Sequence, residues 1–290
     1  MTEKDMGVIL AKSAGFCPGV KKAIDCVLGL AQSGQSPIYT FGPLIHNPQV
    51  IESLEEKNIH AIKSLAEIKD KSGVLVIRAH GVTPIVEAEL RTLGIAVVDG
   101  TCPLVKRAHT VIAEYAAKGY ATVIVGDAGH AEVVGLLGYA DGRGHVVSDA
   151  REAEALPSFD KVNVVAQTTQ DEEVFLAVVE LIRARARECL VSDTICLPTR
   201  ERQTETRSLA ARADMIIVVG GRQSANTARL AQLCDSLCPS VLLVETEDEL
   251  DEAVVSSPKR IGVTAGASTP NWMTERVVAR LREIRRSPLV

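Results

Sequence analysis

The sequence predicts an α/β protein of three pseudo-symmetric lobes, and three observations support this fold class. Aromatic residues make up only 3% of the 290 residues, and the apolar 46% is mainly valine, isoleucine, leucine and alanine, as in buried parallel strands covered by helices. Short apolar runs that end in glycine or a small polar turn recur, each followed by a helical pattern. Cysteine-containing turns recur at residues 17, 102 and 196, with 85 and 94 residues between successive cysteines.

The apolar runs predict strands of βαβ units, in which ligands bind where a strand ends and a helix begins. The runs are VLVIRAHGV at 74–82, ATVIVGDAGH at 121–130, MIIVVGGRQSAN at 215–226 and RIGVTAGASTP at 260–270. A shorter apolar stretch, residues 8–10, precedes the first cysteine turn. Three polar stretches indicate surface segments and helix starts: 66–73, 148–162 and 246–259.

The cysteine turns divide the chain into thirds. GFCPG, GTCPL and TICLP contain Cys17, Cys102 and Cys196, and a proline follows each cysteine directly or after one residue. Because the chain is longer than a usual single domain, we expect lobes over 14–101, 102–195 and 196–290, with residues 1–13 packing against the third. Each lobe then contributes one cysteine to a common centre.

Composition excludes several classes of protein. The net charge of −5 comes without a block of basic residues, which argues against nucleic-acid binding. No apolar run approaches the roughly 18 residues of a membrane span, and no secretory signal is visible, so we expect a cytoplasmic protein that binds no membrane. Seven cysteines, an odd number, in a reducing compartment favour metal binding, catalysis or burial over disulfides.

Four cysteines have a simple interpretation as small buried hydrophobes. Cys26 and Cys189 lie in helical patterns, and Cys234 and Cys238 lie on a face that Leu230 and Leu237 also occupy.

The three turn cysteines differ, because a rigid turn presents a thiolate for metal ligation, although burial remains the simpler alternative for any one of them. Three thiolates complete neither a tetrahedral zinc site nor a fully ligated iron–sulfur cluster. They would leave one iron of a 4Fe-4S cluster open to substrate.

Histidines follow three apolar stretches with glycine close by: His46, His80 and His130. Histidines at strand ends bind an anion when charged, or transfer a proton when poised near neutrality. Glu132 provides an acid/base partner in the loop of His130, the alternative being a glutamate that caps the helix or faces solvent.

Two serine-containing turns predict anion sites at helix N-termini. Ser224 and Asn226 precede a helical run that starts near Thr227, and Ser268 precedes Pro270, which suits a first helical turn. No Gly-Lys dipeptide occurs, so neither turn is the P-loop of a nucleotide hydrolase. Together with the histidines, the turns indicate a phosphate or diphosphate ligand.

Nine motifs, taken in order, resemble the LytB family of 4-hydroxy-3-methylbut-2-enyl diphosphate reductases over about residues 7–275. They are GFCPGV, GPLIHNPQV, RAHGV, DGTCPLVKRAH, GHAEVVG, QTT, DTICLPTRERQ, GGRQSANTARL and TAGASTPNW. The resemblance implies a three-lobed cloverleaf around one 4Fe-4S cluster, which the three turn cysteines ligate. It also implies a diphosphate site formed by His46, His80, Ser224, Asn226 and Ser268.

By the same resemblance, His130, Glu132 and Thr169 lie near the substrate's hydroxyl, with Glu132 in the proton relay. The implied reaction is reductive dehydroxylation of (E)-4-hydroxy-3-methylbut-2-enyl diphosphate to isopentenyl and dimethylallyl diphosphate, with two electrons and two protons. Since no flavin or nicotinamide motif is visible, we expect a ferredoxin or flavodoxin as electron donor.

The chain departs from the family pattern at Ala131 and Leu136, in the proton-relay loop, and at Ala225, where many members have a second serine. Two alternatives to a reductase are a diphosphate-binding protein without metal, and a cluster-containing redox or iron sensor without turnover that depends on Glu132.

Overall fold

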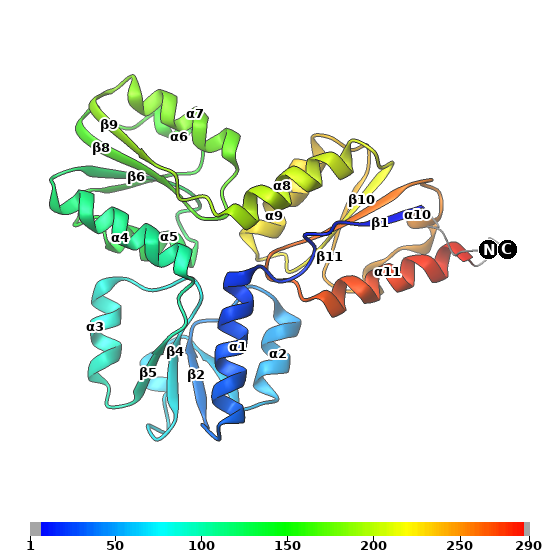
Figure 1. Ribbon diagram of the computed structural model, residues 1–290, viewed down its shortest axis with the longest axis horizontal. Helices are drawn as coiled ribbons and strands as arrows, with labels where there is room; N and C mark the ends of the chain where they lie inside the picture. The colour runs from blue at the N-terminus through cyan, green and yellow to red at the C-terminus, as the bar shows by residue number, and fades with distance from the viewer. Residues whose placement is uncertain (1–6, 287–290) are drawn as a thin grey trace. The chain divides into compact units, whose positions relative to one another are not determined.

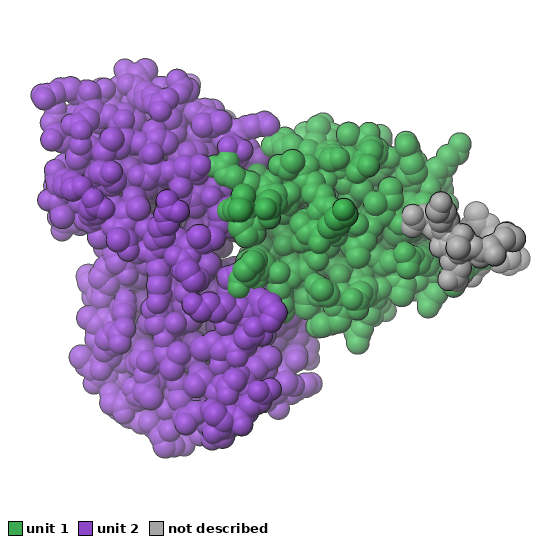
Figure 2. Space-filling view, in the orientation of Figure 1, with its two compact units in different colours: residues 1–18, 197–290 green, residues 19–196 purple. Residues whose placement is uncertain are grey.

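Twelve short strands form three parallel sheets of four in the part of the chain, residues 7–286, that this computed structural model describes (Figure 1). The prediction of three α/β lobes is thus confirmed. The lobes lie in two compact units, residues 1–18 with 197–290 and residues 19–196 (Figure 2). The sequence predicts that residues 1–13 pack with the third lobe. Residues 1–6 of that segment, and residues 287–290 of the lobe, lie outside the described residues.

The first and second lobes form the unit of residues 19–196. The first sheet has the order β3-β2-β4-β5, and the second has the order β7-β6-β8-β9. The strands of the first sheet are β2 (Ile38–Phe41), β3 (Ile59–Ile62), β4 (Val74–Ile77) and β5 (Ala96–Asp99). Those of the second are β6 (Ala121–Val125), β7 (Gly144–Val147), β8 (Phe159–Ala166) and β9 (Ala186–Ser192).

The third lobe has the order β1-β12-β10-β11 and joins both ends of the chain, because β1 (Val8–Leu10) pairs with β12 (Ile261–Ala265). Its other strands are β10 (Met215–Val219) and β11 (Val241–Val244). In each sheet, the first strand of the lobe lies between the second and the third, and the fourth strand pairs with the third. In the third lobe, β10, β11 and β12 are the first, second and third strands, and β1 takes the place of the fourth. The same strand order in each lobe is the pseudo-symmetry that the sequence predicts.

Helices follow the strands along the chain. Those of the unit of residues 19–196 are α1 (Pro18–Gln32, which begins one residue earlier), α2 (Pro48–Glu55), α3 (Pro84–Thr92), α4 (Pro103–Ala117), α5 (Ala131–Gly138), α6 (Ala150–Glu154) and α7 (Glu172–Arg183). Those of the other unit are α8 (Leu197–Ala210), α9 (Ala225–Asp235), α10 (Glu252–Ser256) and α11 (Asn271–Arg286). No helix in the described range 7–286 combines the length and the apolar character that crossing a membrane requires.

Burial on both faces explains why the central strands are continuous apolar runs. Along β10, Met215, Ile217 and Val219 pack into one core cluster, and the residues between them pack into another. Local capping then starts the helices. Asn47 and Thr83 accept hydrogen bonds from the first turns of α2 and α3, each of which begins with proline, whose fixed φ suits that position.

Four expectations about local structure were wrong. The stretch 148–162 is not all surface and helix start, because its last four residues begin β8. Cys189 lies in strand β9, not in a helix. The helix after Ser224 starts at Ala225, ahead of Thr227. Cys234 and Cys238 are buried as expected, but Leu237 is 43% exposed and does not share their face.

Candidate active site

The expected site residues occupy equivalent positions in the three lobes. Five positions after the first strand of each lobe stands a candidate site residue: His46 after β2, His130 after β6 and Ser224 after β10. The residue three positions after the third strand is His80, Thr169 or Ser268, following β4, β8 and β12. First and third strands are neighbours whose connections leave in opposite directions, and the carboxyl ends of such strands are where open α/β sheets bind ligands.

Each turn cysteine follows the fourth strand of a lobe and is tied to the loop after the third strand. The backbone N–H of Cys102 donates to Ala79 O, that of Cys196 to Thr168 O, and that of Cys17 to Ala267 O, each at 3.0 Å. All three acceptors lie two residues after the end of the third strand. One backbone hydrogen bond therefore places each cysteine beside the candidate ligand-binding residue of the same lobe.

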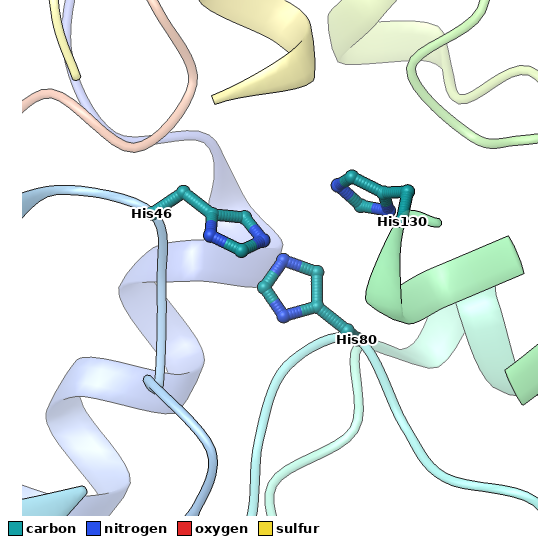
Figure 3. A group of neighbouring side chains, drawn as sticks. All are labelled: His46, His80 and His130. Atoms are coloured by element: carbon teal, nitrogen blue, oxygen red, sulfur yellow. The ribbon is translucent and has the colours of Figure 1, made fainter. Parts of the chain in front are cut away.

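Three histidine rings meet in the unit of residues 19–196. His46 and His80 have ring centroids 4.5 Å apart, and His130 lies 5.3 Å from each of them (Figure 3). The three residues come from the ends of β2, β4 and β6, so two lobes contribute to the cluster. One donor nitrogen of each ring lies within 4.8 Å of the others, close enough to surround a small ion.

The electrostatics of this cluster favour an anion over a metal cation. Burial, followed by the charge of Arg78, lowers the pKa of His46. The pKa of His80 lies well below its usual value, because of burial, the two other histidines and Arg78. Neutral imidazoles ligate metals, but a guanidinium beside them repels a cation and attracts an anion.

Glu132 is a buried carboxylate, 3% exposed, on the first turn of α5. The backbone N–H of Thr168 donates to its Oε1 (2.6 Å), and the hydroxyl of Thr168 donates to its Oε2 (2.9 Å). The alternative of a solvated glutamate is therefore wrong. Thr169 is half-buried and next in the chain, but the hydrogen bonds to Glu132 come from Thr168.

His130 is the N-cap of α5, and its Nδ1 accepts a hydrogen bond from the N–H of Glu132 at 3.2 Å. A neutral imidazole that accepts at Nδ1 carries its proton on Nε2. One short turn thus holds His130, a hydrogen-bond donor of the histidine cluster, and Glu132, a buried carboxylate. His130 is placed to bind an anion, and Glu132 is placed to transfer a proton beside it.

The two serine turns meet inside the third lobe. Ser224 caps α9 and Ser268 precedes α11; both are buried, and the Ser268 hydroxyl donates to Ser224 Oγ at 3.4 Å. Gly266 allows this approach, because a Cβ there would lie 2.1 Å from the hydroxyl of Thr227. Asn226 is 5% exposed, and its Nδ2 has no hydrogen-bond partner among residues 7–286. An anion at these turns would supply that acceptor.

Two charged residues of α8 hold the turn of Cys17. Arg202, 3% exposed, donates to Ala265 O (2.6 Å) and to Gly15 O (2.9 Å), so it joins the end of β12 to the loop before Cys17. Glu205 accepts from the backbone N–H groups of Lys12 and Ser13. The order of the motifs indicates none of these contacts, because they join residues 63 to 193 positions apart in the chain.

A cavity of about 660 Å³ in the unit of residues 19–196 contains none of the expected site residues. His109 lines it and stacks on Tyr139, with ring centroids 4.2 Å apart. His109 lies in α4 and is buried, and its Nε2 has no partner among the described residues.

Comparison with known proteins identifies the family. Residues 8–282 match the family model described as LytB protein. The chain belongs to the LytB family. It is 46% identical over 280 residues to a 4-hydroxy-3-methylbut-2-enyl diphosphate reductase of Citrifermentans bemidjiense, with 96% of this chain and 98% of the relative covered. The corresponding enzyme of Aquifex aeolicus is 40% identical over 286 residues, with 98% of both chains covered.

Solved structures agree with this assignment to the LytB family. The structure of an (E)-4-hydroxy-3-methyl-but-2-enyl diphosphate reductase, described as the terminal enzyme of the non-mevalonate pathway, matches with a TM-score of 0.69 at 40% identity, covering 95% of this chain and 99% of that one. The E-1-hydroxy-2-methyl-but-2-enyl-4-diphosphate reductase of Plasmodium falciparum matches with a TM-score of 0.88 at 28% identity, covering 94% and 86%. The family resemblance that the nine motifs indicate is confirmed.

Proposed function

We propose that the chain is a 4-hydroxy-3-methylbut-2-enyl diphosphate reductase. It removes the hydroxyl of the (E)-allylic diphosphate with two electrons and two protons and gives isopentenyl and dimethylallyl diphosphate. One observation carries the proposal. The buried carboxylate Glu132 is joined by its backbone N–H to Nδ1 of His130, which belongs to the cluster of three histidines. Dehydroxylation of a diphosphate needs both groups, one to hold the anion and one to move a proton.

The cysteines support a 4Fe-4S cluster bound by Cys17, Cys102 and Cys196. All three are half-buried cysteines next to the starts of α1, α4 and α8, where backbone N–H groups of the first helical turn favour a bound anionic group. Three of the other cysteines are poorer ligands, because burial raises the pKa of Cys26 and of Cys189, and that of Cys234 to about 12. When bound, the cluster supplies single electrons and an iron that polarises the hydroxyl.

The protein's own groups bind the substrate and transfer protons. His46, His80, Ser224, Asn226 and Ser268 bind the diphosphate and so fix the position of the carbon chain. His130 and Thr169 lie at the hydroxyl end, and Glu132 delivers the proton that lets the oxygen leave as water. Thr168 keeps this carboxylate in place through its two hydrogen bonds. Protonation at either end of the allylic system then gives the two products.

The arrangement of the lobes and the protein's surroundings are part of the same proposal. The lobes, 14–101, 102–195 and 196–290, surround the cluster. The electrons come from a ferredoxin or flavodoxin, in the cytoplasm. The departures Ala131, Leu136 and Ala225 weaken or reshape binding and leave the reaction unchanged, because Glu132, Ser224 and Asn226 remain.

An anaerobic purification tests the proposal most directly. A brown protein with about four irons and as many sulfides, which converts the hydroxylated diphosphate in the presence of a chemical reductant, supports a reductase. A colourless protein that binds diphosphate after careful reconstitution points to a binding protein, and a cluster-containing protein without turnover points to a sensor. Either result overturns the proposal.

The carboxylate is tested by Glu132→Gln, which keeps the shape of the side chain but cannot deliver a proton. General acid catalysis contributes about 10²–10⁴-fold, so we expect kcat to fall by that factor while the dissociation constant for substrate changes little. Glu87→Gln, at a half-buried carboxylate of α3 that pairs with Arg91, serves as a control for losing a carboxylate away from the site. Turnover of Glu132→Gln at the unaltered rate removes Glu132 from the proton path.

A further inference from the structure

Arg78 is a guanidinium that the fold leaves without a counter-charge. It is the first residue after β4 and lies half-buried in the RAHGV motif. Its side chain makes no hydrogen bond and no ion pair with any residue in the described range 7–286, and its Nε is buried without a partner. Buried charges are otherwise paired, because an unpaired one costs free energy.

Two partly exposed carboxylates of the first lobe have cationic partners other than Arg78. Glu87 binds Arg91 at 2.6 Å, and Asp99 binds Lys106 at 2.5 Å. Neither is a partner of Arg78. The positive charge at the end of β4 is therefore available to an external anion.

The backbone makes room for this guanidinium beside the histidines. Gly42, the residue after β2, has φ +78°, and a Cβ there would lie 2.3 Å from Nη1 of Arg78. Any other residue at position 42 would be strained and would displace the guanidinium. Four residues further along the same loop stands His46, and two residues after Arg78 stands His80.

The influence of this charge is visible at both histidines. It contributes, after burial, to the lowered pKa of His46 and of His80. Both imidazoles are therefore neutral near pH 7. They offer N–H groups and lone pairs, but no net charge, to an entering diphosphate.

We infer that Arg78 supplies the fixed positive charge that binds the substrate's diphosphate, while His46 and His80 act as neutral hydrogen-bonding groups beside it. This inference rests on the proposed function, since it names a further binding residue of the same site. It also explains why an uncompensated charge persists in the free protein. The site is incomplete until an anion enters.

The test measures binding of inorganic diphosphate to the cluster-loaded protein by isothermal titration calorimetry. Arg78→Met keeps an apolar stem and removes the charge, and Arg78→Lys keeps the charge. Charged hydrogen bonds of this kind correspond to about 10- to 100-fold in affinity. We expect Arg78→Met to weaken binding by that factor and Arg78→Lys to recover part of it. Arg91→Met, an exposed arginine of α3 in the same lobe, should bind as the unaltered protein does.

Thermal unfolding without ligand separates this role from a structural one. Removing an unpaired buried charge raises the melting temperature of Arg78→Met, whereas removing a structural contact lowers it. Equal diphosphate affinity in Arg78→Met and the unaltered protein, or a lowered melting temperature of the variant, overturns the inference. If the unaltered protein itself binds no diphosphate, the proposed function fails first, and the two failures are distinguished.

Discussion

Protonation of His109 should destabilise the protein as the pH falls, and the structure gives the size of the effect. Burial against Tyr139 lowers the pKa of His109 from 6.5 to about 4. In the unfolded chain the imidazole takes up a proton near pH 6.5, whereas in the folded protein it does so only near pH 4. Below pH 6.5 the unfolded state therefore binds more protons, and stability falls as the pH falls.

The full shift of 2.5 units corresponds to about 3.4 kcal/mol, at 1.36 kcal/mol for each unit. Because the loss accumulates gradually between the two pKa values, it amounts to about 2 kcal/mol at pH 5. His109→Phe removes the proton-binding group and its unpartnered nitrogen while keeping a ring to stack on Tyr139. We therefore expect the variant to lose about 2 kcal/mol less than the unaltered protein between pH 8 and pH 5.

Urea unfolding followed by far-UV circular dichroism, under anaerobic conditions, measures this difference. At pH 8 the histidine is neutral in both states, so the difference between the two proteins there gives the packing effect of the substitution alone. The remaining difference at pH 5 reports the titration, because all other groups are common to both proteins. Parallel loss of stability in both proteins from pH 8 to pH 5 would refute the reasoning.

Three further predictions concern the site. Thr168→Val removes a hydroxyl that donates to the buried carboxylate, a bond of about 1.5–3 kcal/mol, so kcat should fall about 10- to 100-fold in steady-state assays; an unchanged kcat contradicts the role assigned to this contact. Cys17→Ser should lose iron and sulfide on analysis, whereas Cys234→Ser, at a buried cysteine of α9, should retain both; a fully loaded Cys17→Ser protein would falsify the ligand assignment. Arg202→Met leaves two buried carbonyls without donors and should destabilise the unit of residues 1–18 and 197–290 by about 2–5 kcal/mol in urea unfolding, and an unchanged midpoint contradicts the proposed tie between the loops.

The sequence reveals the central strands better than the edge strands, for a physical reason. Strands β4, β6, β10 and β12 are buried on both faces, so they are continuous apolar runs. Edge strands carry exposed and charged residues, as at Glu188 in β9, and their patterns resemble loops. The start of β8 resembles a surface segment although β8 is a central strand, because its second residue is the exposed Asp160.

The site was predictable where one residue type serves one chemistry. Three histidines that follow apolar runs with glycine close by predict one polar site, and the structure brings their rings together. Thr168 was missed because QTT offers two adjacent threonines, and only the fold decides which one meets Glu132. Arg78 and Arg202 were missed because arginine in a sequence usually indicates a solvated surface. Their surroundings exist only after folding: Arg202 donates to Gly15 O and Ala265 O, and Nε of Arg78 is buried without a partner among residues 7–286.

The pairing of β1 with β12 has a consequence for how the protein is made. Val8 cannot pair with Ile261 until nearly the whole chain has been synthesised, which at about 5–20 residues per second takes roughly 10–50 s. The unit of residues 19–196 has all its strands by then and is free to fold while the ribosome is still translating. Cys17 is the first of the three turn cysteines to be synthesised, and it is the last to reach its folded position. A site that includes Cys17 is therefore completed only after β12 has been synthesised and has folded.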